Sequence, residues 1–225
     1  MRSGISRTTC VAVLSLAAAC GARAQNQAVP ADVKAFVTQY VAAFNAKDVA
    51  RLESMYHPKS AACITPQNKD YYDGAMAVQM RDSIPANYTI STMTPNENNL
   101  KALESMGESF PVKPAQELHI DYQQGDDSGS VVVWLVRENG RLFGDFPCIT
   151  DAALKQFRDE TPARNAAMAR YRALADGIKD PLRTELLGMI REHKTSTAID
   201  RYHEASGKDY QTSMFVINEL KTEAR

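Results

Sequence analysis

The clearest structural signal in the chain is LHIDYQQGDDSGSVVVWLVRENGRLFGDFPCI, residues 118–149. Leu118, Ile120 and Tyr122 alternate with polar residues, which is the pattern of a strand with one buried face. The polar residues 123–129 that follow predict a turn. The stretch therefore predicts consecutive strands that are joined by turns.

The next predicted strand, Val131–Val136, is apolar on both faces. Because a strand with one solvated face would alternate, we expect both faces of the sheet to be covered there. The cover is either the C-terminal part of the chain or a second copy, which leaves a homodimer open. Asn139 and Gly140 both tolerate the positive φ angles of a type I′ turn, so residues 141–149 are expected to return as a hairpin strand.

Helices are expected before this sheet. Apolar residues recur at helical spacing from Val33 to Phe44, which predicts an amphipathic helix. Asp48 is placed to cap a second helix, and Pro58 stops that helix. The remaining expected elements are a short strand at 61–65, a helix at 74–83, a strand at 88–93 and a helix at 96–106.

The last third of the chain is expected to be a separate helical module. Thr161-Pro162 and Asp180-Pro181 each resemble the capping residue and first residue of a helix. Two shorter helices are expected at 197–206 and 209–220, and Gly207 separates them. The sequence therefore predicts an α+β domain followed by an all-α module.

The N-terminus has the three parts of an export signal. Arg2 and Arg7 precede an apolar run from Cys10 to Cys20, and Ala22-Arg23-Ala24 fits the small-residue cleavage rule. We therefore expect residues 1–24 to be a signal peptide and the protein to be periplasmic or secreted. An alternative is a lipoprotein anchor at Cys20.

The cysteine content agrees with export. Removal of the signal peptide would leave Cys63 and Cys148, an even number of thiols in an oxidising compartment. We expect them to form a disulfide. The alternative is two buried free thiols that pack as small apolar residues.

Composition excludes several classes of protein. The formal net charge is −1, so no large basic field for nucleic acid is present. No apolar run reaches the roughly 20 residues of a membrane span. The sequence has no metal-binding motif, no phosphate-binding glycine loop and no Gly-x-Ser-x-Gly element, so no cofactor or metal is expected.

One family resemblance covers about residues 30–150. The segments FVTQYVAAFNAKDVARLESMYHPKSAACITP (36–66) and YYDGAMAVQM (71–80), followed by the strand pair, resemble the nuclear transport factor 2-like superfamily and its SnoaL-like branch. The resemblance implies a cone-like α+β fold, in which a curved mixed or antiparallel sheet wraps on N-terminal helices. Members of this superfamily include isomerases, dehydratases, hydrolases and proteins with no known activity. One departure is Lys59, where the superfamily often has an acid.

A second resemblance lies in the helical module, residues 151–225. TSTAIDRYHEASGKDYQTSMFVINEL, within about residues 195–220, is similar to the helical hairpin in the C-terminal domain of the bacterial ribosomal stalk protein. Gln211 to Met214 replace the charged residues that the stalk protein has there. The resemblance therefore implies a packing or docking unit and not a role in translation.

Two titratable residues are weak catalytic candidates. His57 ends the second predicted helix, where the resemblance implies the mouth of a pocket, and a histidine there can act near neutral pH. Asp145 lies in an apolar strand, where burial would raise its pKa. The alternatives are a half-exposed helix terminator for His57 and an edge-strand charge for Asp145. His119 and Asp121 share one strand face and are expected on the outer face of the sheet.

Four aromatic residues are candidates for an apolar pocket: Tyr40, Phe44, Tyr72 and Trp134. The alternative is that they are ordinary core residues. We expect an exported bacterial protein that binds an apolar small molecule or another partner without catalysis. An acid–base enzyme (dehydratase, isomerase or hydrolase) is an alternative if His57 or Asp145 is buried inside the cone beside a tyrosine. A protein that docks through its C-terminal helices is another, and it would expose an apolar helix face.

Overall fold

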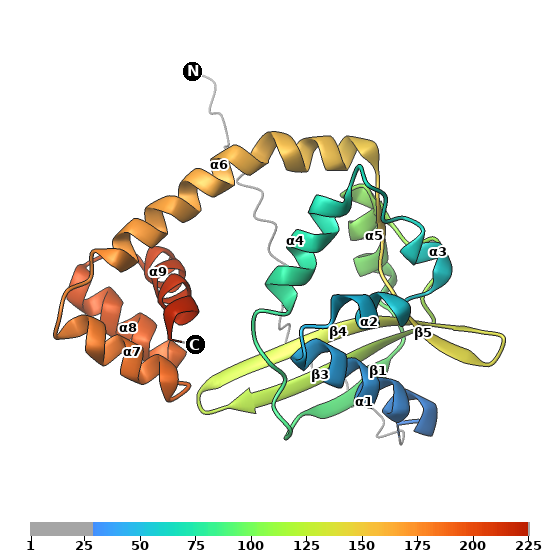
Figure 1. Ribbon diagram of the computed structural model, residues 1–225, viewed down its shortest axis with the longest axis horizontal. Coiled ribbons are helices and arrows are strands. Elements are labelled where there is room, and N and C mark those ends of the chain that lie inside the picture. Colours follow the sequence, from blue (N-terminus) through green and yellow to red (C-terminus); the bar gives the residue numbers. More distant parts are fainter. Residues whose placement is uncertain (1–28, 225) are drawn as a thin grey trace.

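An antiparallel sheet forms the centre of the computed structural model, which describes residues 29–224 (Figure 1). Its strands, in spatial order, are β1 (Thr89–Met93), β3 (Gln116–Gln124), β4 (Asp127–Glu138) and β5 (Arg141–Asp145). A separate two-stranded ladder pairs β2 (Glu108–Ser109) with β6 (Cys148–Ile149). The expected α+β class with an antiparallel sheet is confirmed.

Both hairpin turns of the sheet use positive φ angles. Asn139 and Gly140 have φ values of 50° and 75°, as expected for the turn between β4 and β5. The turn between β3 and β4 is shorter than predicted, because the ladder continues to the Gln124–Asp127 pair. Gly125 has a φ of 60°, which glycine adopts without strain, and this allows the tight turn.

Five helices occur between residues 31 and 105: α1 (Ala31–Asn45), α2 (Val49–Ser54), α3 (Pro58–Ala61), α4 (Lys69–Gln79) and α5 (Glu97–Ser105). The apolar face of α1 packs on the inner face of the sheet, which presents Leu118, Ile120, Val131 and Val133. Asp48 caps α2, as expected: its Oδ1 accepts a hydrogen bond from the Arg51 N–H at 3.0 Å.

The segment between α2 and α4 differs from the prediction. The prediction of a strand at 61–65 is wrong, because α3 ends at Ala61 and a turn follows. His57 and Pro58 start this helix, in which the His57 side chain accepts a hydrogen bond from the Lys59 N–H. The next helix, α4, begins at Lys69 and not at Gly74.

The long helix α6 (Asp151–Asp176) carries the chain from the sheet to the C-terminal helices (Figure 1). The expected helix start at Thr161-Pro162 is wrong, because Thr150 caps the helix and Pro162 lies inside it. A proline removes a backbone donor and crowds the preceding turn. Pro162 leaves the Arg158 carbonyl without its helical donor; at the adjacent residue, the Thr161 hydroxyl and the Arg164 guanidinium both donate to the Phe157 carbonyl, at 2.7 and 2.6 Å.

Three further helices complete the C-terminal region: α7 (Leu182–Arg191), α8 (Thr195–Ser206) and α9 (Tyr210–Glu223). They enclose a second hydrophobic cluster, which includes Leu186, Ile217 and Leu220. Gly207 adopts a left-handed conformation, with a φ of 65°, and ends α8 as expected. The helical nature of this region is confirmed.

The C-terminal helices contact the tip of the β3–β4 hairpin (Figure 1). Asp127 accepts hydrogen bonds from the Thr195 N–H at 3.0 Å, the Thr195 hydroxyl at 2.7 Å and the Lys221 ammonium at 3.2 Å. The Asp126 N–H donates to the His193 carbonyl at 2.9 Å. The Asp127 carboxylate at the start of β4 therefore caps the first residue of α8.

The outer face of the sheet is covered only in part. Phe110 packs on Trp134, with ring centroids 5.0 Å apart, and His57 packs on Phe143 at 5.3 Å. Val132 on the same face stays 38% exposed. Of the two covers expected for this face, the C-terminal helices bind the hairpin tip instead, and a second copy stays a prediction.

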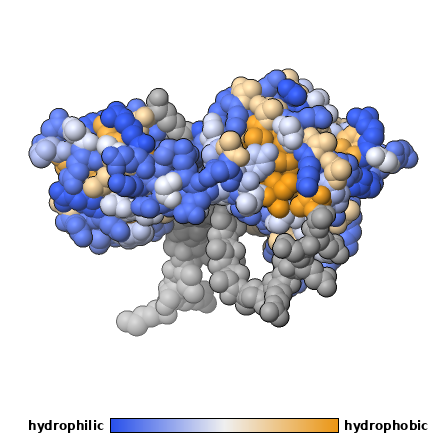
Figure 2. Space-filling model, turned by 90° about the horizontal axis from the view of Figure 1, so that it is seen from below, coloured by the Kyte–Doolittle hydropathy of each residue, from blue (hydrophilic) through white to orange (hydrophobic). Residues whose placement is uncertain are grey.

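The molecule has a mixed surface. Seen from below, hydrophobic residues gather on the part that contains the sheet, whereas the helical part is mostly hydrophilic on that side (Figure 2). None of the helices within residues 29–224 is long and apolar enough to cross a membrane. The predicted signal peptide, with Cys20, lies outside the described residues.

Candidate functional site

The site is organised where the end of α2 meets β5. The His57 N–H donates to the Gly144 carbonyl at 2.8 Å, and the Gly144 N–H donates to the Met55 carbonyl at 3.0 Å. A Cβ atom at position 144 would lie 3.0 Å from the Tyr56 ring, closer than side chains normally approach. The glycine therefore lets the Tyr56 ring pack directly on the strand.

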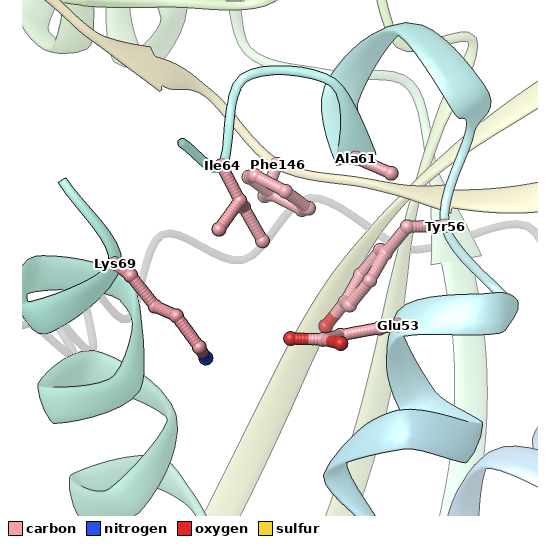
Figure 3. A pocket seen from close by; sticks show the side chains of 6 residues that line it. All are labelled: Glu53, Tyr56, Ala61, Ile64, Lys69 and Phe146. Carbon is pink, nitrogen blue, oxygen red and sulfur yellow. The ribbon is translucent and has the colours of Figure 1, made fainter. Parts of the chain in front are cut away.

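A cleft of about 230 Å³ opens beside this contact (Figure 3). Its lining residues are Glu53, Tyr56, Ala61, Ile64, Lys69 and Phe146. The Tyr56 and Phe146 rings meet edge to face, with centroids 4.8 Å apart and planes at 87°. The walls are thus aromatic and aliphatic, and two side chains of opposite charge complete the lining.

The negative charge of Glu53 affects the pKa values of two neighbouring side chains, Lys69 and Tyr56. The hydrogen bond to Asp73 raises the pKa of the Lys69 ammonium, and the negative charge of Glu53 adds to this effect. Burial raises the pKa of the Tyr56 hydroxyl to about 12; the hydrogen bond with Tyr40 lowers it in part, and the negative charge of Glu53 raises it. Tyr56 is therefore a neutral phenol at physiological pH, so it can donate or accept a hydrogen bond.

A buried polar cluster lies at the end of β5, next to Phe146. The Ser60 hydroxyl and the Phe146 N–H both donate to Asp145 Oδ1, the latter at 2.9 Å. Asp145 Oδ2 has no hydrogen-bond partner among residues 29–224. Burial raises the pKa of Asp145, while Ser60, the Phe146 N–H and His57 lower it in part. Asp145 is 2% exposed, so the predicted buried carboxylate is present, although the cleft does not reach it.

His57 is 1% exposed and uses both ring nitrogens within the protein. Nδ1 accepts from the Lys59 N–H at 3.2 Å, so the ring proton resides on Nε2. Nε2 then donates to Glu138 Oε2 at 3.2 Å. These two hydrogen bonds hold α3 against the β4–β5 hairpin.

The proximity of Ser60, His57 and Asp145 does not form a nucleophilic triad. A triad needs the serine oxygen hydrogen-bonded to the histidine, and the histidine oriented by the acid. Here the Ser60 hydroxyl bonds to Asp145, and Ser60 is fully buried. The three residues therefore act as a structural network.

The four aromatic candidates are dispersed and do not line this cleft. Tyr40 and Phe44 lie in the core beneath α1, with ring centroids 5.9 Å apart. Trp134 packs on Phe110 at the outer face of the sheet. The Tyr72 hydroxyl accepts from the Ile149 N–H at 3.0 Å and holds the β6 segment.

The aromatic residues that do line the cleft are sequence neighbours of the two titratable candidates. Tyr56 precedes His57, and Phe146 follows Asp145. Their position next to His57 and Asp145 is the sequence feature that could have identified them as lining residues. The other histidine candidate, His119, bonds to Glu117 at 3.2 Å, and Asp121 on the same strand face is exposed.

Cys63 and Cys148 lie at disulfide distance, with Cα atoms 5.5 Å apart. We predicted a strand for Cys63, but this residue lies in the turn after α3. Cys148 lies in β6. Ile64 adjoins one cysteine, and Phe146 lies two residues before the other. The pair therefore connects two walls of the cleft.

The raised pKa of Asp145 predicts a pH-dependent effect on stability. Because burial raises its pKa above the ordinary value of 3.8, the folded protein retains this proton to higher pH than the unfolded chain does. The protonated Asp145 stabilises the folded protein fully below pH 3.8. This contribution is lost as the pH rises through the pKa that Asp145 has in the folded protein. As the pH rises from 3.5 to 7, the native protein should therefore lose stability relative to Asp145→Asn. The free energy of unfolding of the variant, minus that of the native protein, should increase over this range. Urea denaturation at a series of pH values measures this difference.

The matched control for this experiment is Asp200→Asn, at an exposed position of α8. Its difference from the native protein should lack the rise expected for Asp145→Asn. A difference for Asp145→Asn that falls with increasing pH would show that the hydrogen bonds to Oδ1 outweigh burial.

Comparison with known proteins gives no relative: no family model, curated protein or solved structure matches the chain significantly. Within residues 29–224 no group of three His, Cys, Asp or Glu side chains could hold a metal ion. The fold and the site thus define an α+β protein with a helical C-terminal region and a small amphiphilic cleft.

Proposed function

We propose that this chain is an exported protein whose cleft binds a small molecule with an apolar body, without transforming it chemically. The observation that carries the proposal is the lining of the cleft, in which Tyr56, Ile64 and Phe146 supply an apolar surface. Ligand sites are typically mostly apolar with a few polar groups that fix orientation. The predicted export signal at residues 1–24 and the pairing distance of Cys63 and Cys148 support an oxidising compartment.

The buried network supports binding over catalysis. A general acid or base must reach the proton that it transfers, directly or through one water. His57 and Asp145 are both almost fully buried and bonded within the protein, and neither lines the cleft. A ligand in the cleft would meet the Tyr56 and Phe146 side chains in front of them.

An acid–base enzyme is the second candidate, because one observation favours it. Asp145 has an unpartnered carboxylate oxygen, burial raises its pKa, and it adjoins a residue of the cleft wall. Functional sites often hold such perturbed groups. The two candidates differ in the fate of the ligand, which a binding protein returns unchanged.

The proposal includes the nuclear transport factor 2-like superfamily as the fold family. The packing of α1 on the inner face of an antiparallel sheet, and the Asp48 cap after it, support this assignment. A cone-like wrapping of the sheet around α1 is the finer expectation. An experimental structure that superposes on a superfamily member over residues 30–150 would support it, and a flat sheet would contradict it.

Titration of the processed protein with 2-phenylethanol, followed by two-dimensional NMR, tests the binding proposal. We expect saturable shifts of the resonances of Tyr56, Ile64 and Phe146. Ile64→Asn makes one wall polar and should weaken binding about tenfold. Val78→Asn, at an exposed position of α4, is the matched control and should bind like the native protein.

The same samples separate the two candidate functions. Native mass spectrometry of the protein from its own host should show a small bound molecule, and that molecule should be recovered unchanged after incubation. Conversion of the molecule would favour the enzyme. Shifts that avoid the cleft, or none at millimolar probe, would contradict the binding proposal.

A further inference from the structure

We propose that the ligand of this cleft is a zwitterion with one apolar group, such as a free aromatic or branched-chain amino acid. This inference rests on the proposed function and adds the chemical class of the ligand. Three features of the cleft carry it: a carboxylate without a hydrogen-bond partner, an ammonium with donors to spare, and an apolar space of limited size.

The carboxylate belongs to Glu53, which reaches the cleft from α2. Its oxygens point into the cleft beside the Tyr56 hydroxyl (Figure 3). None of the residues 29–224 donates a hydrogen bond to it, yet its charge acts on both Tyr56 and Lys69. A ligand ammonium at this position would give Glu53 a charge-assisted hydrogen bond. The faces of the adjacent aromatic rings would add a cation–π attraction.

The ammonium belongs to Lys69, which faces the cleft from the first turn of α4 (Figure 3). It bonds to Asp73 at 2.6 Å, and this uses one of its three N–H donors. The other donors remain for a ligand carboxylate. Because Glu53 and Lys69 approach the cleft from different helices, a ligand with both charges would bridge α2 and α4.

A ligand with a single charge fits this arrangement less well. An amine would attract Glu53 but would be repelled by Lys69, and a carboxylate would meet the reverse situation. A molecule with adjacent positive and negative groups satisfies both side chains at once. The opposite charges of the cleft therefore select for a zwitterion.

The size of the cleft limits the apolar part of the ligand. A cavity of about 150 Å³ is large enough for benzene, and pockets for drug-sized ligands have volumes of about 300 Å³ or more. The volume of about 230 Å³ lies between these limits. It suits one ring or branched aliphatic group against Ile64 and Phe146, with its charged end at Glu53 and Lys69.

Calorimetric titration with four probes that share a phenyl ring tests the inference: L-phenylalanine, 2-phenylethylamine, 3-phenylpropanoate and the neutral 2-phenylethanol. At low salt the native protein should bind phenylalanine up to about fivefold more tightly than either singly charged probe. Glu53→Gln should remove the preference for phenylalanine over phenylpropanoate. Lys69→Gln should remove the preference over phenylethylamine.

Glu104→Gln and Lys34→Gln make the same chemical changes at exposed positions away from the cleft. They should retain the native order of affinities. Equal binding of all four probes would overturn the zwitterion inference and leave the proposed apolar cleft intact. Failure of all four to bind would overturn both. A preference for phenylalanine that survives in Glu53→Gln and Lys69→Gln would place the charged contacts elsewhere and overturn the inference.

Discussion

Replacement of Cys63 and Cys148 by serine should lower the free energy of unfolding by up to about 4–5 kcal/mol. The two residues are 85 positions apart in the sequence, and cross-linking so long a loop restricts the unfolded chain strongly. The measured loss is often smaller than this chain-entropy value, because the reduced unfolded state retains some structure. Urea denaturation of the processed native protein and of the double variant measures the change.

The control for this prediction is reduction of the disulfide. A dithiol reductant should bring the native protein to the stability of the double variant and should leave the variant itself unchanged. An assay of thiols in the unfolded, unreduced protein should find none. Two titratable thiols would show that the cysteines are not bonded despite their distance.

Much of the sheet was predictable because its signals are local. The alternation from Leu118 to Tyr122 needs only the period of a strand, and Asn139-Gly140 needs only the backbone preferences of two residues. Gly207 ended α8 for a similar reason, since glycine adopts the left-handed conformation without strain. Such features depend little on the rest of the chain.

The wrong predictions depended on partners that are distant in the sequence or on competing side chains. Thr161-Pro162 has the composition of a helix start, but Thr150 caps the helix upstream and the helix continues through Pro162. Residues 61–65 have apolar strand-like composition. The helix that His57 starts with Pro58 ends just before them and leaves them in a turn.

The candidate site shows the same division. His57 and Asp145 were recognisable individually, because a histidine beside a proline and a carboxylate in an apolar strand are both unusual. Their shared network with Ser60 depends on the contact between the His57 backbone and Gly144. This contact helps to bring Tyr56 and Phe146 together as one wall of the cleft, so their sequence positions beside the two candidates did not by themselves reveal the cleft.

The residues that the structure describes form two hydrophobic clusters, and their separation has a thermodynamic consequence. Within residues 29–224 the cluster beneath α1 and the cluster of the C-terminal helices share no residue. The described links between the two parts include the helix α6 and the contacts of Asp126 and Asp127 at the hairpin tip. A cavity in one cluster should therefore destabilise mainly its own part of the molecule.

Leu220→Ala should destabilise the C-terminal helices by about 2–5 kcal/mol, because Leu220 is fully buried and truncation leaves a cavity. The single tryptophan, Trp134, lies on β4, so its fluorescence reports the sheet. In urea, the far-ultraviolet circular dichroism of the variant should show an early helical transition, while the fluorescence midpoint moves little. Leu118→Ala in the first cluster is the matched control and should shift the fluorescence midpoint. Equal shifts of both signals in Leu220→Ala would show that the hairpin-tip contacts and α6 couple the two parts into one cooperative unit.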